Sequence, residues 1–269
     1  KAVDYKVEVI LGPVFSDTVT KAAKIARKSN IKIFSFSNNK AIAGDGVYIL
    51  GLLPDQQVER MLLFSNSRGL KGYSAIVPDN AYGKQIEDLL KKYSSWAGGH
   101  LNEIGIYSPS TKYSVAAHAI AKGFAKTGAK PSQHTDLLVI PEGGKKLNDI
   151  AAALASAGVG CNVVRCLGVS SWDDRDVISI KALDGAWYAA SPYEEVEQFL
   201  YRFQSINNYL PDEIATLAYD AANMAVELSS ASFDTAQVQR YNGFKGIKGI
   251  YRFLPDGSSQ RGYAIYEIK

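Results

Sequence analysis

The chain alternates short runs of β-branched and aliphatic residues with longer stretches whose apolar residues recur at helical spacing. The run at 7–11 has a single polar interruption, as expected of a parallel strand that is covered on both faces. A Gly-Pro pair ends this strand, and apolar spacing over 18–28 predicts a helix capped by Ser16 or Asp17. A second strand is expected at 31–37. This order predicts two parallel strands joined by a right-handed crossover.

The alternation continues almost to the C-terminus and predicts an α/β fold with mainly parallel sheets. Further strands are expected at 47–52, 73–79, 101–107, 135–141, 162–169 and 185–190. Further helices are expected at 55–66, 84–96, 114–127, 146–157, 194–207 and 212–230. The tail, 250–268, is expected to form a hairpin, because Pro255-Asp256-Gly257 is a strong turn signal.

Composition and charge narrow the class of protein. The length of 269 residues suffices for one or two domains, and 46% hydrophobic with 21% charged residues is typical of a soluble globular chain. The formal net charge is only +3, with lysines and glutamates interspersed, so no nucleic-acid partner is expected. No apolar run approaches the roughly 20 residues that cross a bilayer, so no transmembrane segment is expected.

The N-terminus shows no signal peptide and no cysteine for lipidation. Residues 2–6 look like the tail of a helix that leads directly into the first strand. We therefore expect either that a leader and more were removed, or that the sequence begins inside a domain.

The two cysteines, Cys161 and Cys166, fall in or beside the strand expected at 162–169. In an extended chain their Cα atoms would be roughly 16 Å apart, far beyond disulfide reach. A tight turn would allow them to pair. The pattern nevertheless predicts two free, mostly buried thiols, which indicate nothing firm about the redox compartment.

Motifs for catalysis are missing from the sequence. It contains no phosphate loop, no complete dinucleotide-binding turn and no nucleophile elbow. His100, His118 and His134 are scattered, and with only two cysteines they do not make a zinc-binding pattern. We therefore expect a protein that is not an enzyme and that has no cofactor and no metal site.

Polar side chains follow the first two expected strands. Ser16 comes shortly after the first strand, and Ser37 and Asn39 end the second. In open α/β sheets, ligands lie at the carboxyl ends of strands and against helix N-termini. The pattern suggests a binding wall formed by these three residues. The alternative is that they only cap helices and turns.

Several blocks of the sequence resemble the type I periplasmic binding protein superfamily, the leucine/isoleucine/valine-binding class. These blocks are Leu11-Gly12-Pro13 followed by Ser16, Phe34-Ser35-Phe36-Ser37, and Pro78-Asp79-Asn80-Ala81-Tyr82-Gly83. Later blocks at 167–174, 218–222 and 246–257 are similar to the penicillin-binding protein activator branch. That branch comprises envelope lipoproteins that stimulate a peptidoglycan synthase in Gram-negative bacteria. The resemblance covers essentially the whole chain.

The resemblance implies two Rossmann-like α/β lobes joined by a three-segment hinge, with a ligand cleft between the lobes. It divides the chain into a first lobe of residues 1–52 plus 193–257 and a second lobe of residues 53–192 plus 258–269. Members of the superfamily begin with two further strand–helix units before the Gly-Pro turn. The first lobe is therefore expected to lack its opening strands.

The resemblance also implies ligand-binding roles for Ser16, Ser37, Asn39, Tyr82 and Asp184. Ser16 matches the position that holds a ligand carboxylate, and Ser37 and Asn39 line the same wall. Tyr82 is expected to reach in from the other lobe. Asp184, just before the strand that returns to the hinge, matches the acid that binds an ammonium group. All five are expected at the carboxyl ends of strands or in the turns beside them.

Two functions are implied. The first is a non-catalytic envelope protein, in the periplasm of a Gram-negative bacterium, that stimulates a peptidoglycan synthase by protein contact. The alternative is a solute-binding receptor that delivers an amino acid or amide to an ABC permease. The blocks at 172–174 and 253–257 favour the activator, whereas Ser16, Tyr82 and Asp184 favour the receptor.

Overall fold

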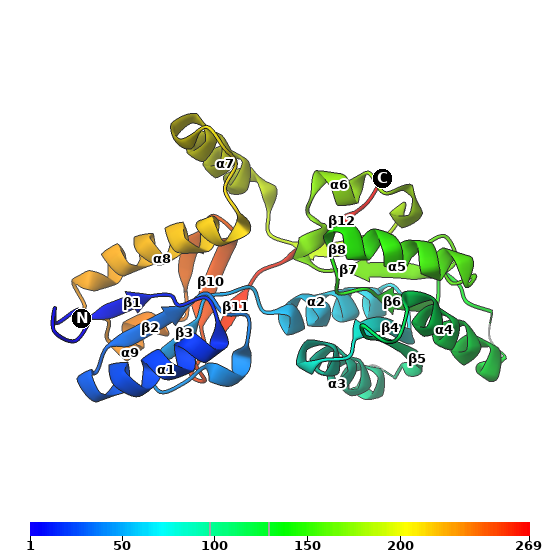
Figure 1. The fold of residues 1–269 in the computed structure, drawn as a ribbon, viewed down its shortest axis with the longest axis horizontal. Coiled ribbons are helices and arrows are strands. Elements are labelled where there is room, and N and C mark those ends of the chain that lie inside the picture. Colours follow the sequence, from blue (N-terminus) through cyan, green and yellow to red (C-terminus); the bar gives the residue numbers. More distant parts are fainter. Residues whose placement is uncertain (97, 129) are drawn as a thin grey trace. The chain divides into compact units, whose positions relative to one another are not determined.

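The computed structural model describes residues 1–96, 98–128 and 130–269 (Figure 1). The chain forms two compact units, each with its own sheets and hydrophobic cores. Unit 1 comprises Lys1–Leu53 and Ser191–Gly262. Unit 2 comprises Pro54–Ala190 and Tyr263–Lys269. The chain therefore crosses three times from one unit to the other. Among the described residues, no helix combines the length and the apolar character needed to cross a membrane.

Unit 1 contains two three-stranded sheets, one parallel in the order β1-β2-β3 and one antiparallel in the order β11-β10-β9. Its first segment contains β1 (Val9–Leu11), α1 (Ser16–Ala26), η1 (Arg27–Ser29), β2 (Lys32–Ser35), η2 (Lys40–Ile42) and β3 (Val47–Ile49). Its second segment contains α7 (Tyr193–Asn207), α8 (Glu213–Ser229), α9 (Thr235–Val238), β9 (Phe244–Gly246), β10 (Gly249–Phe253) and β11 (Ser259–Arg261).

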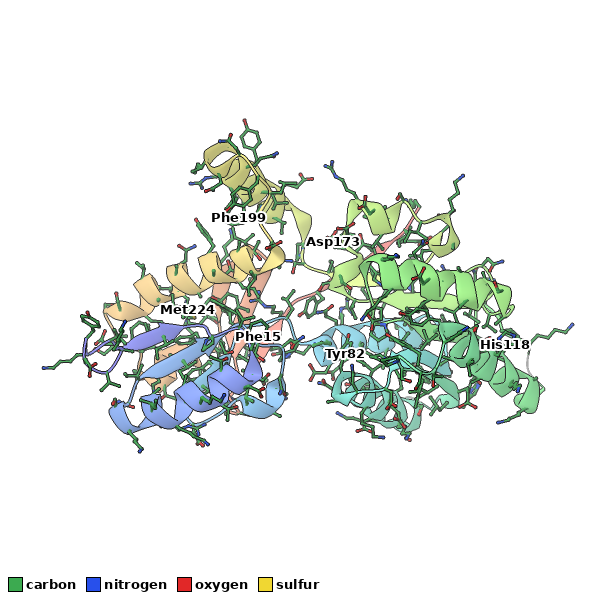
Figure 2. The ribbon with its side chains drawn as sticks, viewed as in Figure 1. Phe15, Tyr82, His118, Asp173, Phe199 and Met224 are labelled. Atoms are coloured by element: carbon green, nitrogen blue, oxygen red, sulfur yellow. A yellow bond between two sulfur atoms is a disulfide. The ribbon has the colours of Figure 1, made fainter. Side chains whose placement is uncertain are left out.

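The parallel sheet of unit 1 is covered on both faces, because neighbouring residues of a strand point in opposite directions. On one face, Ile33 of β2 packs with Ala23 of α1. On the other face, Phe34 packs with Met224 of α8 and Phe253 of β10. Figure 2 labels Met224 on α8. This burial explains why the strand is apolar on both faces.

A buried ion pair joins α8 to the antiparallel sheet of unit 1. The Oδ2 atom of Asp220 lies 4.0 Å from Nη1 of Arg261, and both side chains are 1% exposed. Asp220 Oδ1 accepts a hydrogen bond from the N–H of Ile247 at 2.7 Å. Arg261 donates to the carbonyl of Leu50 at 3.2 Å and lies over the ring of Tyr251. Burial raises the pKa of Asp220, while the Ile247 N–H and the Arg261 charge oppose that rise.

Unit 2 contains one six-stranded sheet in the order β12-β8-β7-β6-β4-β5, in which only β12 runs antiparallel to its neighbour. Its strands are β4 (Gly72–Pro78), β5 (His100–Tyr107), β6 (Asp136–Val139), β7 (Arg165–Gly168), β8 (Trp187–Ala190) and β12 (Ala264–Glu267). Its helices are α2 (Pro54–Ser67), α3 (Ala81–Trp96), α4 (Tyr113–Thr127), α5 (Gly144–Ser156), η3 (Ser170–Trp172), α6 (Arg175–Ile178) and η4 (Lys181–Leu183).

Helices cover both faces of this sheet as well. Ile76 of β4 packs in a core with Phe124 of α4 and Leu154 of α5. The next residue, Val77, packs in a separate core with Met61 of α2. The prediction of an α/β fold with mainly parallel sheets is therefore confirmed.

The tail of the chain differs from the single hairpin predicted for 250–268. The hairpin comprises only β10 and β11, and its turn is closed by the Leu254 N–H, which donates to the Ser258 carbonyl at 2.8 Å. Arg261 is buried in unit 1, so β11 stays in that unit. The chain leaves unit 1 only after Gly262, and β12 then pairs with β8.

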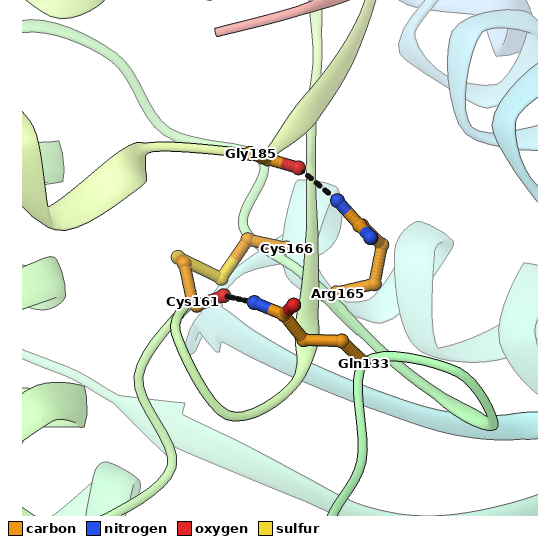
Figure 3. Close-up of a disulfide and its surroundings, with 5 residues drawn as sticks. All are labelled: Gln133, Cys161, Arg165, Cys166 and Gly185. Carbon is orange, nitrogen blue, oxygen red and sulfur yellow. Dashed lines mark hydrogen bonds between the residues drawn. A yellow bond between two sulfur atoms is a disulfide. The ribbon is translucent and has the colours of Figure 1, made fainter. Parts of the chain in front are cut away.

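Cys161 and Cys166 form a disulfide, so the prediction of two free thiols is wrong (Figure 3). Their Cα atoms are 5.1 Å apart. The expected strand begins only at Arg165, and the preceding residues form a turn in which the Val164 N–H donates to the carbonyl of Gly160 at 3.1 Å. The distance estimate failed because it assumed an extended chain where the chain reverses direction.

Replacement of Asp220 by alanine should destabilise unit 1 by about 3–5 kcal/mol, because Arg261 would lose its buried counter-charge. All three tryptophans of the chain belong to unit 2, so amide hydrogen exchange in β10 is the suitable measurement. Glu227→Ala is a matched control on the same helix. Glu227 makes an exposed ion pair with Arg240, whose loss should cost less than about 1 kcal/mol. Equal losses of protection in both variants would contradict the prediction.

Reduction of the disulfide should lower the free energy of unfolding of unit 2 by about 2 kcal/mol, the chain-entropy value for so short a loop. Urea titrations followed by tryptophan fluorescence, with and without a phosphine reductant, measure this difference. The double variant Cys161→Ala/Cys166→Ala is the control. A reductant effect that persists in this variant would show that the disulfide is not its source.

Candidate functional site

The start of α1 is an exposed helix N-terminus in unit 1. The residue before the helix is Phe15, which is extended, with φ −92° and ψ 135°, and 75% exposed (Figure 2). The expected caps, Ser16 and Asp17, lie instead inside the first turn. A phenylalanine side chain accepts no hydrogen bond, so Phe15 leaves the first-turn amides without a side-chain cap. Such an N-terminus favours an anion.

Two serines form a hydrogen bond beside this helix start. The Oγ atoms of Ser16 and Ser37 are 3.0 Å apart. Ser37 is 3% exposed, and its Oγ also accepts from the N–H of Asn39 at 3.2 Å. When Ser37 donates to Ser16, the hydroxyl proton of Ser16 is directed to an external acceptor. A negatively charged acceptor would strengthen the whole chain of hydrogen bonds.

Asn39 lies beside Ser37, near the carboxyl end of β2, and also has a structural role. Its Oδ1 accepts from the N–H of Ala41 at 3.0 Å and so caps η2. Its side chain is exposed, and its Nδ2 group is not used in that cap. The structure therefore brings Ser16, Ser37 and Asn39 together at the carboxyl ends of β1 and β2, as the sequence predicted.

In unit 2, Tyr82 lies in the first turn of α3, directly after β4 (Figure 2). Its hydroxyl donates to the carbonyl of Pro141 at 3.1 Å, which fixes the ring against the end of β6. Tyr82 does not cap its own turn, because Asn80 Oδ1 accepts from the Gly83 N–H there. Burial, followed by the negative charge of Glu142, raises the pKa of the Tyr82 hydroxyl.

Glu142 lies at the same edge of this sheet and was not among the residues that the sequence predicted. Its carboxylate accepts a hydrogen bond from the Tyr107 hydroxyl, and Lys146 Nζ lies 3.9 Å from its other oxygen. Its backbone carbonyl accepts from Nε1 of Trp172 at 2.8 Å. The side chain is only 15% exposed. The sequence carried a signal for it, because Glu142 follows an expected strand as Tyr82 does, and Tyr107 is the last residue of another.

Asp184 does not belong to this edge, which corrects the prediction that all five residues lie at the carboxyl ends of strands or in the turns beside them. It follows η4 and precedes β8, and its side chain is exposed. β8 runs parallel to β7, so the residue before β8 lies at the amino edge of the sheet. Figure 3 shows the neighbouring Gly185, whose carbonyl accepts from Arg165 at the start of β7. Asp184 and Tyr82 therefore lie at opposite edges of one sheet.

In the part of the chain that the structure describes, no three His, Cys, Asp or Glu side chains gather closely enough to hold a metal ion. His118 is exposed on α4, and its Nδ1 lies 2.7 Å from the carbonyl of Ser114, one helical turn earlier (Figure 2).

The Tyr107–Glu142 contact predicts a distinctive loss of stability in alkaline solution. Burial, the hydrogen bond to Glu142 and the charge of Glu142 raise the pKa of Tyr107 above its value in the unfolded chain. The contribution of Tyr107 to the free energy of unfolding is complete below about pH 10. It declines as the pH rises further, by about 1.4 kcal/mol per pH unit. Tyr107→Phe should remove this contribution to the decline of the unfolding free energy with pH. Urea titrations followed by tryptophan fluorescence between pH 8 and pH 11 compare the two proteins. Identical slopes would show that Tyr107 is not the group responsible.

Comparisons with known proteins agree with this architecture. A leucine-binding protein of Thermotoga maritima superposes with a TM-score of 0.71 at 18% identity, covering 100% of this chain and 79% of that one. An ABC-transporter solute-binding protein of Rhodopseudomonas palustris, in complex with benzoate, superposes with a TM-score of 0.71 at 16% identity, covering 100% and 76%.

The chain also resembles known proteins in sequence. An uncharacterised protein of Rickettsia prowazekii is 29% identical over 91 residues, a match that spans 34% of this chain and only 24% of the relative's length. The profile of the family described as periplasmic binding protein matches residues 1–269. The chain therefore belongs to the periplasmic binding protein family.

Proposed function

We propose that this protein is a non-catalytic receptor that binds a small organic carboxylate outside the cytoplasm and delivers it to an ABC permease. Membership of the periplasmic binding protein family supports both the binding role and the location. The disulfide between Cys161 and Cys166 is consistent with that location, because disulfides persist in oxidising compartments.

The observation that carries the proposal is the Ser16–Ser37 hydrogen bond at the start of α1. A carboxylate placed there accepts from the Ser16 hydroxyl and from first-turn amides. No arginine or lysine belongs to the set of Ser16, Ser37 and Asn39, so a singly charged carboxylate fits better than a phosphate. Leucine and benzoate, the ligands named for two structural relatives, share this single carboxylate.

In unit 2, Tyr82 is proposed as a ligand-binding residue that offers its ring to an apolar group. The predicted ammonium partner, Asp184, lies at the other edge of the sheet. Glu142 does not replace it directly, since its carboxylate already interacts with Tyr107 and Lys146. We therefore propose that the carboxylate is the essential group of the solute, whereas an ammonium group is not required.

Stimulation of a peptidoglycan synthase by contact remains the second candidate. The blocks that suggested it have structural roles in this chain. Trp172 is fully buried, and a Cβ atom on Gly168 would overlap its ring. Phe253 packs in the core of unit 1, and Asp256 pairs with Lys40 in the turn after β10. These contacts account for the blocks without a partner protein, so we rank the receptor first.

Calorimetric titration with leucine and benzoate, and with leucinamide as a ligand without a carboxylate, tests the proposal. A carboxylate should bind, and Ser16→Ala should weaken it about ten- to a hundredfold, because a hydrogen bond to a charged group is lost. Thr20→Ala is the matched control, one turn later on α1, and should change the affinity less than about twofold. Asp184→Ala should also leave the affinity unchanged.

Two outcomes would contradict the receptor. Equal binding of leucinamide and leucine would show that the carboxylate is not recognised. If no carboxylate binds, while the protein stimulates a purified peptidoglycan synthase, the activator function replaces the receptor.

A further inference from the structure

Unit 2 contains a cavity of about 680 Å³ that none of the proposed solute-binding residues lines. It lies between the loop that joins β5 to α4, the turn after β4, and one face of α5. On α5, Lys146, Asp149 and Ala153 line it with the spacing of a single helical face. Its volume is within the range of about 300–1,000 Å³ that is typical of small-molecule sites.

Two tyrosines form an aromatic corner in the wall of this cavity. The ring centroids of Tyr107 and Tyr113 are 4.8 Å apart, with an angle of 71° between the ring planes. Tyr107 is 6% exposed, and its hydroxyl is held by Glu142, so its ring is fixed. The partly buried ring of Tyr113, held against the fixed Tyr107, therefore offers a rigid apolar surface against which a flat ligand can pack.

Hydroxyl groups beside this corner are held in place before any ligand binds. The Ser108 and Thr111 backbones exchange two hydrogen bonds, N–H to carbonyl, at 3.2 and 3.1 Å. The Thr111 N–H also donates to Ser108 Oγ, which lies 2.9 Å from Ser110 Oγ. Ser108 and Thr111 both line the cavity. A loop that is already ordered loses little entropy on binding.

Charges of both signs line the cavity. Lys112 and Lys146 contribute positive charges, Asp79 and Asp149 contribute negative charges, and Lys146 also pairs with Glu142 behind the wall. A strongly anionic or cationic ligand therefore meets repulsion as well as attraction. Ammonium groups donate hydrogen bonds and carboxylates accept them, so the four groups together suit a neutral ligand with many hydroxyls.

We propose that this cavity is a second binding site, for a neutral saccharide of one or two rings. The apolar face of a sugar ring packs on the Tyr107–Tyr113 corner, and its hydroxyls exchange hydrogen bonds with Asp149, Thr111 and Ser108. The proposal does not depend on the carboxylate receptor, because Ser16 and Ser37 belong to unit 1.

Amide chemical shifts of the intact chain, titrated across the millimolar range with N-acetylglucosamine and its β-1,4-linked disaccharide, test the site. Saturable shifts are expected at the amides of 108–114. Asp149→Ala should weaken binding about tenfold, through the loss of an acceptor for sugar hydroxyls. Asn148→Ala, the neighbouring exposed residue on α5 that does not line the cavity, should leave it unchanged.

Two further variants test the position of the site. Thr111→Val removes one hydroxyl while keeping the side-chain shape, and it should also weaken binding. A Ser16→Ala protein should bind the sugar normally, which distinguishes this site from the carboxylate site.

The ligand class is tested with charged sugars. Glucosamine and glucuronate carry one positive and one negative charge, and neither should bind more tightly than N-acetylglucosamine. A strong preference for either charged sugar would overturn the proposal of a neutral ligand. The absence of saturable shifts at 108–114, or binding that Asp149→Ala and Thr111→Val leave intact, would overturn the site itself.

Discussion

Backbone hydrogen bonding between the parallel strands β4 to β8 decides where the polar side chains of unit 2 lie. The ladder pairs β4 with β5 and β6, β6 with β7, and β7 with β8, all in the same direction. Every strand in this set therefore ends at one edge of the sheet. Tyr107 is the last residue of β5, and Tyr82, Glu142 and Trp172 follow strand ends. Tyr107 and Trp172 both donate hydrogen bonds to Glu142, and Tyr82 donates to the neighbouring Pro141 carbonyl. The same polarity places Asp184 and the disulfide at the opposite edge.

In both units, a buried side chain holds a more exposed polar side chain in place by a hydrogen bond. In unit 1 the buried Ser37 positions Ser16, and in unit 2 the buried Tyr107 positions Glu142. Hydrogen bonds in such surroundings are strong electrostatically, and they keep side chains in a defined orientation. This orientation is what a binding site requires before the ligand arrives, because side chains that are already fixed lose little entropy on binding.

Several sequence blocks that resemble the penicillin-binding protein activator branch have packing roles in this structure. Trp172 fills a space that the missing side chain of Gly168 leaves open. Asp220, in the block at 218–222, forms the buried pair with Arg261 that joins α8 to the antiparallel sheet. Asp256 orders its own turn by accepting from the N–H of Ser258 at 2.9 Å. Residues of this kind preserve a fold through any change of ligand or partner, so they are good guides to architecture and poor guides to function.

The sequence by itself determined the order of strands and helices, because the period of the apolar residues differs between the two. It also determined that Ser16 and Ser37 are neighbours, since both follow strands of one parallel pair. Only the tertiary structure decided which edge of the sheet Asp184 occupies, and that Cys161 and Cys166 meet. It alone joined Tyr107 to Glu142, across 35 positions of the sequence. These three outcomes depend on chain reversals and strand polarity, which place residues in space without leaving a periodic pattern in the sequence.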